Sequence, residues 1–149
     1  MGIEISGIGE VREDFVVIRR TGQSYACREK LASLTIVNDS DSDIAFVRLD
    51  GGIFPNGDVC DYSISMRNVP RGFILELKGR DMHHAVEQLC KTLRKLSFHY
   101  AKAVVVSSGA QKIPTGEWQK VQKTFFSSNQ VPLGRFPNNA HVQFLEVVT

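Results

Sequence analysis

The hydrophobic period of the chain changes near residue 80, and that change limits what the sequence can fold into. Before it, Val59–Met66 and Phe73–Lys78 alternate apolar and polar residues around a turn that contains proline and glycine, which is typical of a β-hairpin. After it, the apolar residues of Met82–Leu96 recur at helical spacing. Asp81 directly precedes this pattern and predicts the helix N-terminus, because its carboxylate accepts from free amides of the first turn.

The segments on either side of residues 59–96 supply the remaining elements from which the fold class is predicted. Ile44–Leu49 reads as a strand, and Lys102–Val106 reads as a buried strand, which after a helix is expected to be parallel. Gly116–Phe126 is expected to be a second helix and His141–Val148 a last strand. This order predicts an α/β fold, a mixed β-sheet flanked by helices.

The N-terminal third is less strongly patterned. Glu10–Arg20 contains FVVI and suits an edge strand, and Ser24–Ser33 is expected to form a short helix. The segment 38–43 alternates Asp and Ser after Asn38 and predicts a polar turn, since these side chains bond their own backbone.

With 149 residues, 42% of them hydrophobic, the chain suits one globular domain, 1–149. Its N-terminus does not resemble a signal peptide, and no apolar run approaches the roughly 18 residues of a membrane span. The three cysteines lie far apart, which argues against a disulfide framework or a zinc site. We therefore expect a cytoplasmic protein that does not associate with membranes.

Charge is unevenly distributed along the chain. Residues 1–77 hold 8 Lys/Arg and 12 Asp/Glu, a net charge of −4, whereas residues 78–149 hold 10 and 4, a net charge of +6. A basic C-terminal half would suit a phosphate backbone, and a solvated helical face with surplus lysines would have the same composition.

Three charged side chains interrupt the apolar hairpin. Glu76 and Lys78 share a strand face about 7 Å apart, and a hairpin centred on Val69–Pro70 would place Asp61 near Lys78. Two carboxylates and an amine in one patch would suit Mg²⁺, which takes one or two protein carboxylates, several waters and substrate phosphate. The same residues also suit an ordinary surface ion-pair cluster, and their spacing alone favours that interpretation.

The stretch CDY…FILELKG…AVEQL resembles the active-site ribbon of the PD-(D/E)xK nuclease superfamily, which includes restriction-endonuclease-like and Holliday-junction-resolvase-like enzymes. The matching residues are Asp61, the Glu76–Lys78 motif, Gly79 and Gln88 in the following helix. The resemblance covers about residues 24–107 and leaves 108–149 as a C-terminal extension. It implies a restriction-endonuclease-like core in the order αβββαβ.

By this resemblance, Asp61, Glu76 and the backbone carbonyl of Leu77 would bind Mg²⁺ or Mn²⁺. Lys78 would be the catalytic lysine, and Gln88 would steady the water or the phosphate, although an ordinary exposed helical glutamine fits the sequence equally well. Two features depart from the family pattern. Cys60 replaces the proline of the literal motif, and the acid that many members carry on their first helix has Glu29 as its counterpart.

The function implied is that of a metal-dependent hydrolase, an endonuclease that cuts phosphodiester bonds in DNA. The alternative is a catalytically inactive protein of the same fold that binds nucleic acid or a partner protein. A domain of this size would act as a homodimer or in a larger complex. The side chains expected to contact nucleic acid are His84, Lys91, Arg94, Lys95 and Lys112.

Overall fold

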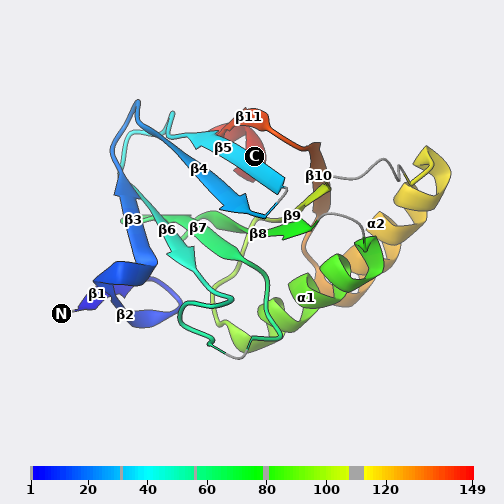
Figure 1. The fold of residues 1–149 in the computed structure, drawn as a ribbon, viewed down its shortest axis with the longest axis horizontal. Coiled ribbons are helices and arrows are strands. Elements are labelled where there is room, and N and C mark those ends of the chain that lie inside the picture. Colours follow the sequence, from blue (N-terminus) through cyan, green and yellow to red (C-terminus); the bar gives the residue numbers. More distant parts are fainter. Residues whose placement is uncertain (1, 31, 56, 79–80, 108–112) are drawn as a thin grey trace.

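The computed structural model describes residues 2–149 apart from 31, 56, 79–80 and 108–112, and its main elements lie in three layers (Figure 1). The central layer is a six-stranded sheet. Its strands, in spatial order, are β10 (Leu133–Pro137), β9 (Lys102–Ser107), β8 (Gly72–Lys78), β7 (Tyr62–Met66), β6 (Ile44–Arg48) and β3 (Val16–Arg19).

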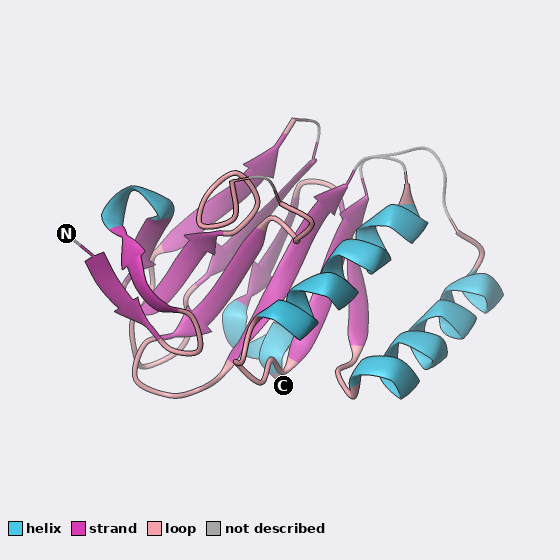
Figure 2. Ribbon diagram, turned by 90° about the horizontal axis from the view of Figure 1, so that it is seen from below, coloured by secondary structure: helices cyan, strands magenta, loops and turns pink. Residues whose placement is uncertain are grey.

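The outer layers differ in kind. On one face of the central sheet, α1 (Met82–Lys95) and α2 (Thr115–Asn129) lie side by side, as Figure 2 shows. The other face is covered by a three-stranded sheet of β11 (Ala140–Gln143), β5 (Ala32–Val37) and β4 (Ser24–Glu29), followed by the short helix α3 (Phe144–Val148). A hairpin of β1 (Gly2–Ile5) and β2 (Gly9–Arg12), and a 3₁₀ turn, Glu13–Phe15, precede β3.

The run from β6 to β9 confirms the central expectation. β6, β7 and β8 are antiparallel neighbours, α1 follows, and β9 pairs with β8 in parallel. The Asp81 carboxylate caps α1 by accepting from the backbone N–H of His84 at 3.0 Å. The α/β class with a mixed sheet is therefore confirmed.

Each face of the central sheet carries its own core, because successive side chains on a strand point to opposite faces. On the helix side, Ile74 and Val105 belong to a buried cluster with Leu89 of α1 and Trp118 of α2. On the other side, Leu75 and Val104 belong to a second cluster with Leu34 and Ile36 of β5.

The expected helix at Ser24–Ser33 is wrong. The segment forms β4 and the start of β5, an antiparallel hairpin. The reason is visible in the burial, since Cys27 in β4 and then Leu34 and Ile36 in β5 are fully buried at strand spacing. A three-stranded sheet thus occupies the face where the αβββαβ order would place its first helix.

The strand expected at His141–Val148 is confirmed only in its first part. It ends at Gln143, and Phe144–Val148 turns into α3, whose residues Phe144, Val147 and Val148 are buried at helical spacing. The Asp39 carboxylate accepts from the N–H of Leu145 at 2.9 Å, a contact across 106 residues. β10 was not expected, and with β11 it makes the C-terminal segment part of both sheets.

The edge strand expected at Glu10–Arg20 is confirmed only in its second half. β3 lies at the edge of the central sheet, whereas residues 10–15 belong to β2 and the 3₁₀ turn. The expected polar turn is present. Asn38 organises the polar turn, because its amide donates to the carbonyls of Arg19 and Ser42 and accepts from the N–H of Ser40. Within the described residues, no helix has the length and apolar character needed to cross a membrane.

Candidate active site

Asp61 directly precedes β7 and is held between two neighbouring strands. Its backbone N–H donates to the carbonyl of Leu75 at 3.1 Å, and its carbonyl accepts from the N–H of Leu49 at 2.8 Å. Its side chain, in a residue only 4% exposed, accepts from the N–H of Leu77 at 2.8 Å through Oδ2. The carboxylate thus takes the place of a backbone carbonyl at the point where β7 begins.

The hairpin register differs from the expected one by two residues. The turn is closed by a bond from the N–H of Met66 to the carbonyl of Arg71 at 2.9 Å, and Tyr62 pairs with Leu75. The next residues outward along the two strands are Asp61 and Glu76. Asp61 therefore lies beside Glu76, not Lys78, and the expected pairing with Lys78 is wrong.

Glu76 lies in β8 and is 2% exposed. It shares a strand face with Ile74, which packs in the core beneath α1, so the Glu76 side chain points into the helix-facing layer. Burial raises the pKa of the Cys60 thiol, and the negative charges of Glu76 and Asp61 raise it further. Both carboxylates therefore lie close enough to one thiol to act on its ionisation.

The backbone of Leu77 faces the Asp61 carboxylate. The N–H and the C=O of a residue in a strand point to the same neighbouring strand. Since the Leu77 N–H donates to Asp61, its carbonyl also points away from β9 and toward the Asp61 side. The Leu77 side chain is 3% exposed and packs in the core between the two sheets.

Lys78 ends β8, and its backbone pairs with Ser107 of β9. The Lys78 side chain lies outside the described part of the structure, as does the whole of Lys112. The roles expected of these two lysines stay predictions.

Gln88 lies on the buried face of α1 and is 6% exposed, so the exposed helical glutamine is excluded. Its Oε1 is buried and has no hydrogen-bond partner in the described residues. One turn later, the Thr92 hydroxyl donates to the Gln88 carbonyl at 2.7 Å and accepts from the N–H of Cys60 at 2.8 Å. Thr92 therefore fixes α1 against the segment that carries Asp61.

Glu29 is the last residue of β4, not a helical residue, which corrects the expected first-helix acid. Its carboxylate forms a hydrogen-bonded ion pair with Arg48, the last residue of β6. The same guanidinium donates to the Tyr62 hydroxyl at 3.1 Å and to the Asp50 carbonyl at 3.0 Å. This network joins the two sheets next to Asp61.

The electrostatics of Asp61 follow from these neighbours. Burial raises the pKa of Asp61 to about 6, and the Leu77 N–H opposes that rise by stabilising the carboxylate. The charges of Glu29 and Asp50 raise the pKa, while the Arg48 guanidinium lowers it. A buried carboxyl with a pKa displaced toward neutrality is typical of functional sites.

Arg48 and Tyr62 were missed by the sequence reading. The available signal was an arginine at the end of the apolar run IAFVRL, where a buried strand would otherwise continue. Its partners come from β4, β7 and the following turn, so local sequence does not identify them.

Arg48→Met is expected to raise the pKa of Asp61 above about 6, because a cation that lowers it is removed. It should also destabilise the fold by about 1 kcal/mol, since the ion pair with Glu29 is one-third exposed and solvent-screened. Carboxyl-detected NMR titration and urea unfolding measure the two effects. Arg48→Lys, which keeps the charge, should leave the Asp61 titration nearer to its original midpoint. An unchanged midpoint in Arg48→Met would contradict the electrostatic link.

The four described residues expected to contact nucleic acid all lie on α1, but their side chains have different environments. His84 and Arg94 are exposed. Lys91 lies 3.2 Å from Glu87 and 3.8 Å from Asp58, and the Lys95 ammonium lies over the Phe54 ring at 5.5 Å. Two of the four described residues are therefore already engaged with neighbouring side chains.

The oxygen donors of this site suit a hard divalent cation such as Mg²⁺ or Mn²⁺ better than a softer metal ion such as Zn²⁺. Among the described residues, no three His, Cys, Asp or Glu side chains gather closely enough to hold a metal ion. Mg²⁺ requires less, because it uses one or two carboxylates and completes its shell with waters and phosphate oxygens. Asp61, Glu76 and the Leu77 carbonyl are oxygen donors of this kind on neighbouring strands.

Comparison with protein-family models, with curated proteins and with solved structures gives no match to this chain.

Proposed function

We propose that the chain is a metal-dependent phosphodiesterase, a nuclease of the PD-(D/E)xK type, with DNA as its substrate. The observation that carries the proposal is the meeting of Asp61, Glu76 and the Leu77 backbone where β7 begins beside β8. The strand order β6–β7–β8, then α1 and a parallel β9, agrees with the βββαβ part of that family's core.

In this proposal, the carboxylates of Asp61 and Glu76 and the carbonyl of Leu77 hold Mg²⁺ or Mn²⁺. The bound ion supplies an activated water and neutralises charge on the phosphate. Gln88 accepts a hydrogen bond from the attacking water through its buried Oε1, and Lys78 donates to the phosphate or orients the water. By family resemblance, water loses a proton and adds to phosphorus, the bond from phosphorus to the 3′ oxygen breaks, and that oxygen takes up a proton. The products are a 3′ hydroxyl and a 5′-phosphate.

A second candidate is a protein of this fold that binds nucleic acid or a partner protein without cutting. The burial of both carboxylates favours it, since Asp61 is 4% and Glu76 2% exposed. The Arg48–Glu29 ion pair next to Asp61 limits the access of solvent to this carboxylate further. A buried carboxylate pair would then be a structural feature, with Asp61 satisfying the Leu77 N–H.

The wild-type protein is expected to cut labelled DNA with Mg²⁺ or Mn²⁺ and to lose this activity in EDTA. Linear, branched and single-stranded substrates should be compared, with separation of the products by length. Lys78→Ala should abolish cutting, whereas Lys123→Ala, an exposed lysine of α2, should cut like the wild type. Binding of the same DNA without cutting under any of these conditions would replace the first candidate with the second.

A further inference from the structure

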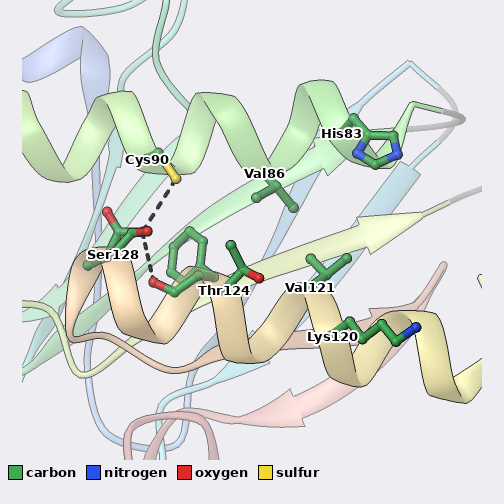
Figure 3. A pocket seen from close by; sticks show the side chains of 9 residues that line it. His83, Val86, Cys90, Lys120, Val121, Thr124 and Ser128 are labelled. Atoms are coloured by element: carbon green, nitrogen blue, oxygen red, sulfur yellow. Dashed lines mark hydrogen bonds between the residues drawn. The ribbon is translucent and has the colours of Figure 1, made fainter.

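A cavity of about 330 Å³ lies between α1 and α2 (Figure 3). Its two ends differ in chemistry. His83 of α1 and Lys120 of α2 lie at one end, as Figure 3 shows, and both side chains are exposed. No acidic residue is among the described residues that line the cavity, so the charge of the Lys120 ammonium is not neutralised from within it.

The middle of the cavity is apolar. Val86 projects from α1 and Val121 projects from α2 (Figure 3). Phe125 also lines the cavity. Phe125 is 2% exposed and belongs to the core beneath the helices, so this wall is fixed by packing. Such a surface suits a flat apolar group.

The far end offers hydrogen-bonding groups. The Asn129 amide donates to the Cys90 sulfur at 3.4 Å and to the Phe125 carbonyl at 3.0 Å, which holds the side chain in place. Ser128 and Thr124 add hydroxyl groups, each able to donate and to accept. The cavity therefore runs from an end with the Lys120 ammonium and the His83 imidazole, past an apolar middle, to a neutral polar end.

We propose that this cavity binds a nucleoside monophosphate, with its phosphate between His83 and Lys120 and its base between Val86 and Val121. A phosphate monoester carries a charge of about −1.5 to −2 at neutral pH, which suits the Lys120 ammonium, since lysine is a regular phosphate ligand. The His83 imidazole adds an N–H donor from the other helix. The edge of a base has donors and acceptors for the polar end. None of these residues belongs to the buried carboxylate site, so the inference stands independently of the proposed nuclease activity.

The same ligand chemistry is present in a free nucleotide and in the 5′-terminal nucleotide of a DNA strand. Calorimetric titration in EDTA should therefore use four probes: thymidine 5′-monophosphate, thymidine, inorganic phosphate and a 5′-phosphorylated tetrathymidylate. The free monophosphate should bind at least about tenfold more tightly than thymidine or phosphate. If the tetramer binds as tightly as thymidine 5′-monophosphate, the ligand is the 5′ end of a strand. If the tetramer does not bind, the ligand is a free nucleotide.

Lys120→Met should weaken binding of thymidine 5′-monophosphate by about fivefold, the size of a partly exposed ion pair. Val121→Phe should block the cavity and abolish binding, with circular dichroism to confirm folding. Lys123→Met removes the same charge from α2 outside this cavity, and it should bind like the wild type. The proposal is overturned by binding weaker than about 1 mM in the wild type, or by equal losses in Lys120→Met and Lys123→Met.

Discussion

Asp61→Asn is expected to raise the free energy of unfolding at pH 7.5 and to leave it nearly unchanged at pH 4. Asparagine keeps the size of the side chain and an oxygen that accepts from the Leu77 N–H, but it removes the buried charge. The gain at pH 7.5 should be about 3 kcal/mol, from a pKa of about 6 in the fold against 3.8 for the free group.

The sign follows from proton binding. Between about pH 4 and pH 6 the folded protein keeps the Asp61 proton that the unfolded chain has lost, so stability falls as pH rises through this window. Stability from this group is fully present below pH 4 and is lost above pH 6. Urea unfolding of both proteins at several pH values measures the difference, from which the contributions of other groups cancel.

Asp61→Ala provides the control. It removes the charge but also the acceptor of the Leu77 N–H, which costs about 1–3 kcal/mol for a buried donor left unpaired. We therefore expect it to be less stable than Asp61→Asn at every pH. A difference between wild type and Asp61→Asn that does not change with pH would show that Asp61 titrates normally in the fold.

Glu76→Gln is expected to abolish metal-dependent cleavage of DNA, with a loss of at least about a hundredfold. The substitution keeps the volume of a side chain that is 2% exposed, and it removes one of the two carboxylates assigned to the metal. Charge stabilisation by a catalytic metal amounts to several kcal/mol, and each 1.36 kcal/mol is a factor of ten in rate. Cleavage rates with Mg²⁺ and Mn²⁺ measure the loss.

A second measurement separates metal binding from folding. Mg²⁺ should raise the unfolding temperature of the wild type, since a ligand that binds only the folded state stabilises it, and should not do so for Glu76→Gln. Glu87→Gln removes an exposed acid of α1 and should behave like the wild type in both assays. Full activity in Glu76→Gln would remove Glu76 from the site, and with it the proposed ligand set.

Local sequence was sufficient for the elements that carry the candidate site. The helix that begins after Asp81 and the apolar strand at Lys102–Ser107 have strong periods, and a single carboxylate caps the helix. Gln88 is buried, so of the two alternatives that the sequence left open, the exposed helical glutamine is excluded. Where local preference and tertiary packing agree in this way, the residues near one another in sequence suffice.

Prediction from local sequence was wrong where pairing with a distant segment determines the secondary structure. The segment Ser24–Glu29 has no strong period of its own, and it becomes a strand because it pairs with β5 over the central sheet. The first-helix acid expected at Glu29 accordingly became the partner of Arg48, 19 residues away.

By itself, the sequence determined the order β6–β7–β8–α1–β9 and the presence of two acids in the hairpin, because strand and helix periods and the α1 cap act over a few residues. Only the tertiary structure decided that Asp61 lies beside Glu76, accepts from the Leu77 N–H and senses the Arg48 charge. Strand register and burial set these relations, and both depend on contacts between residues far apart in the chain.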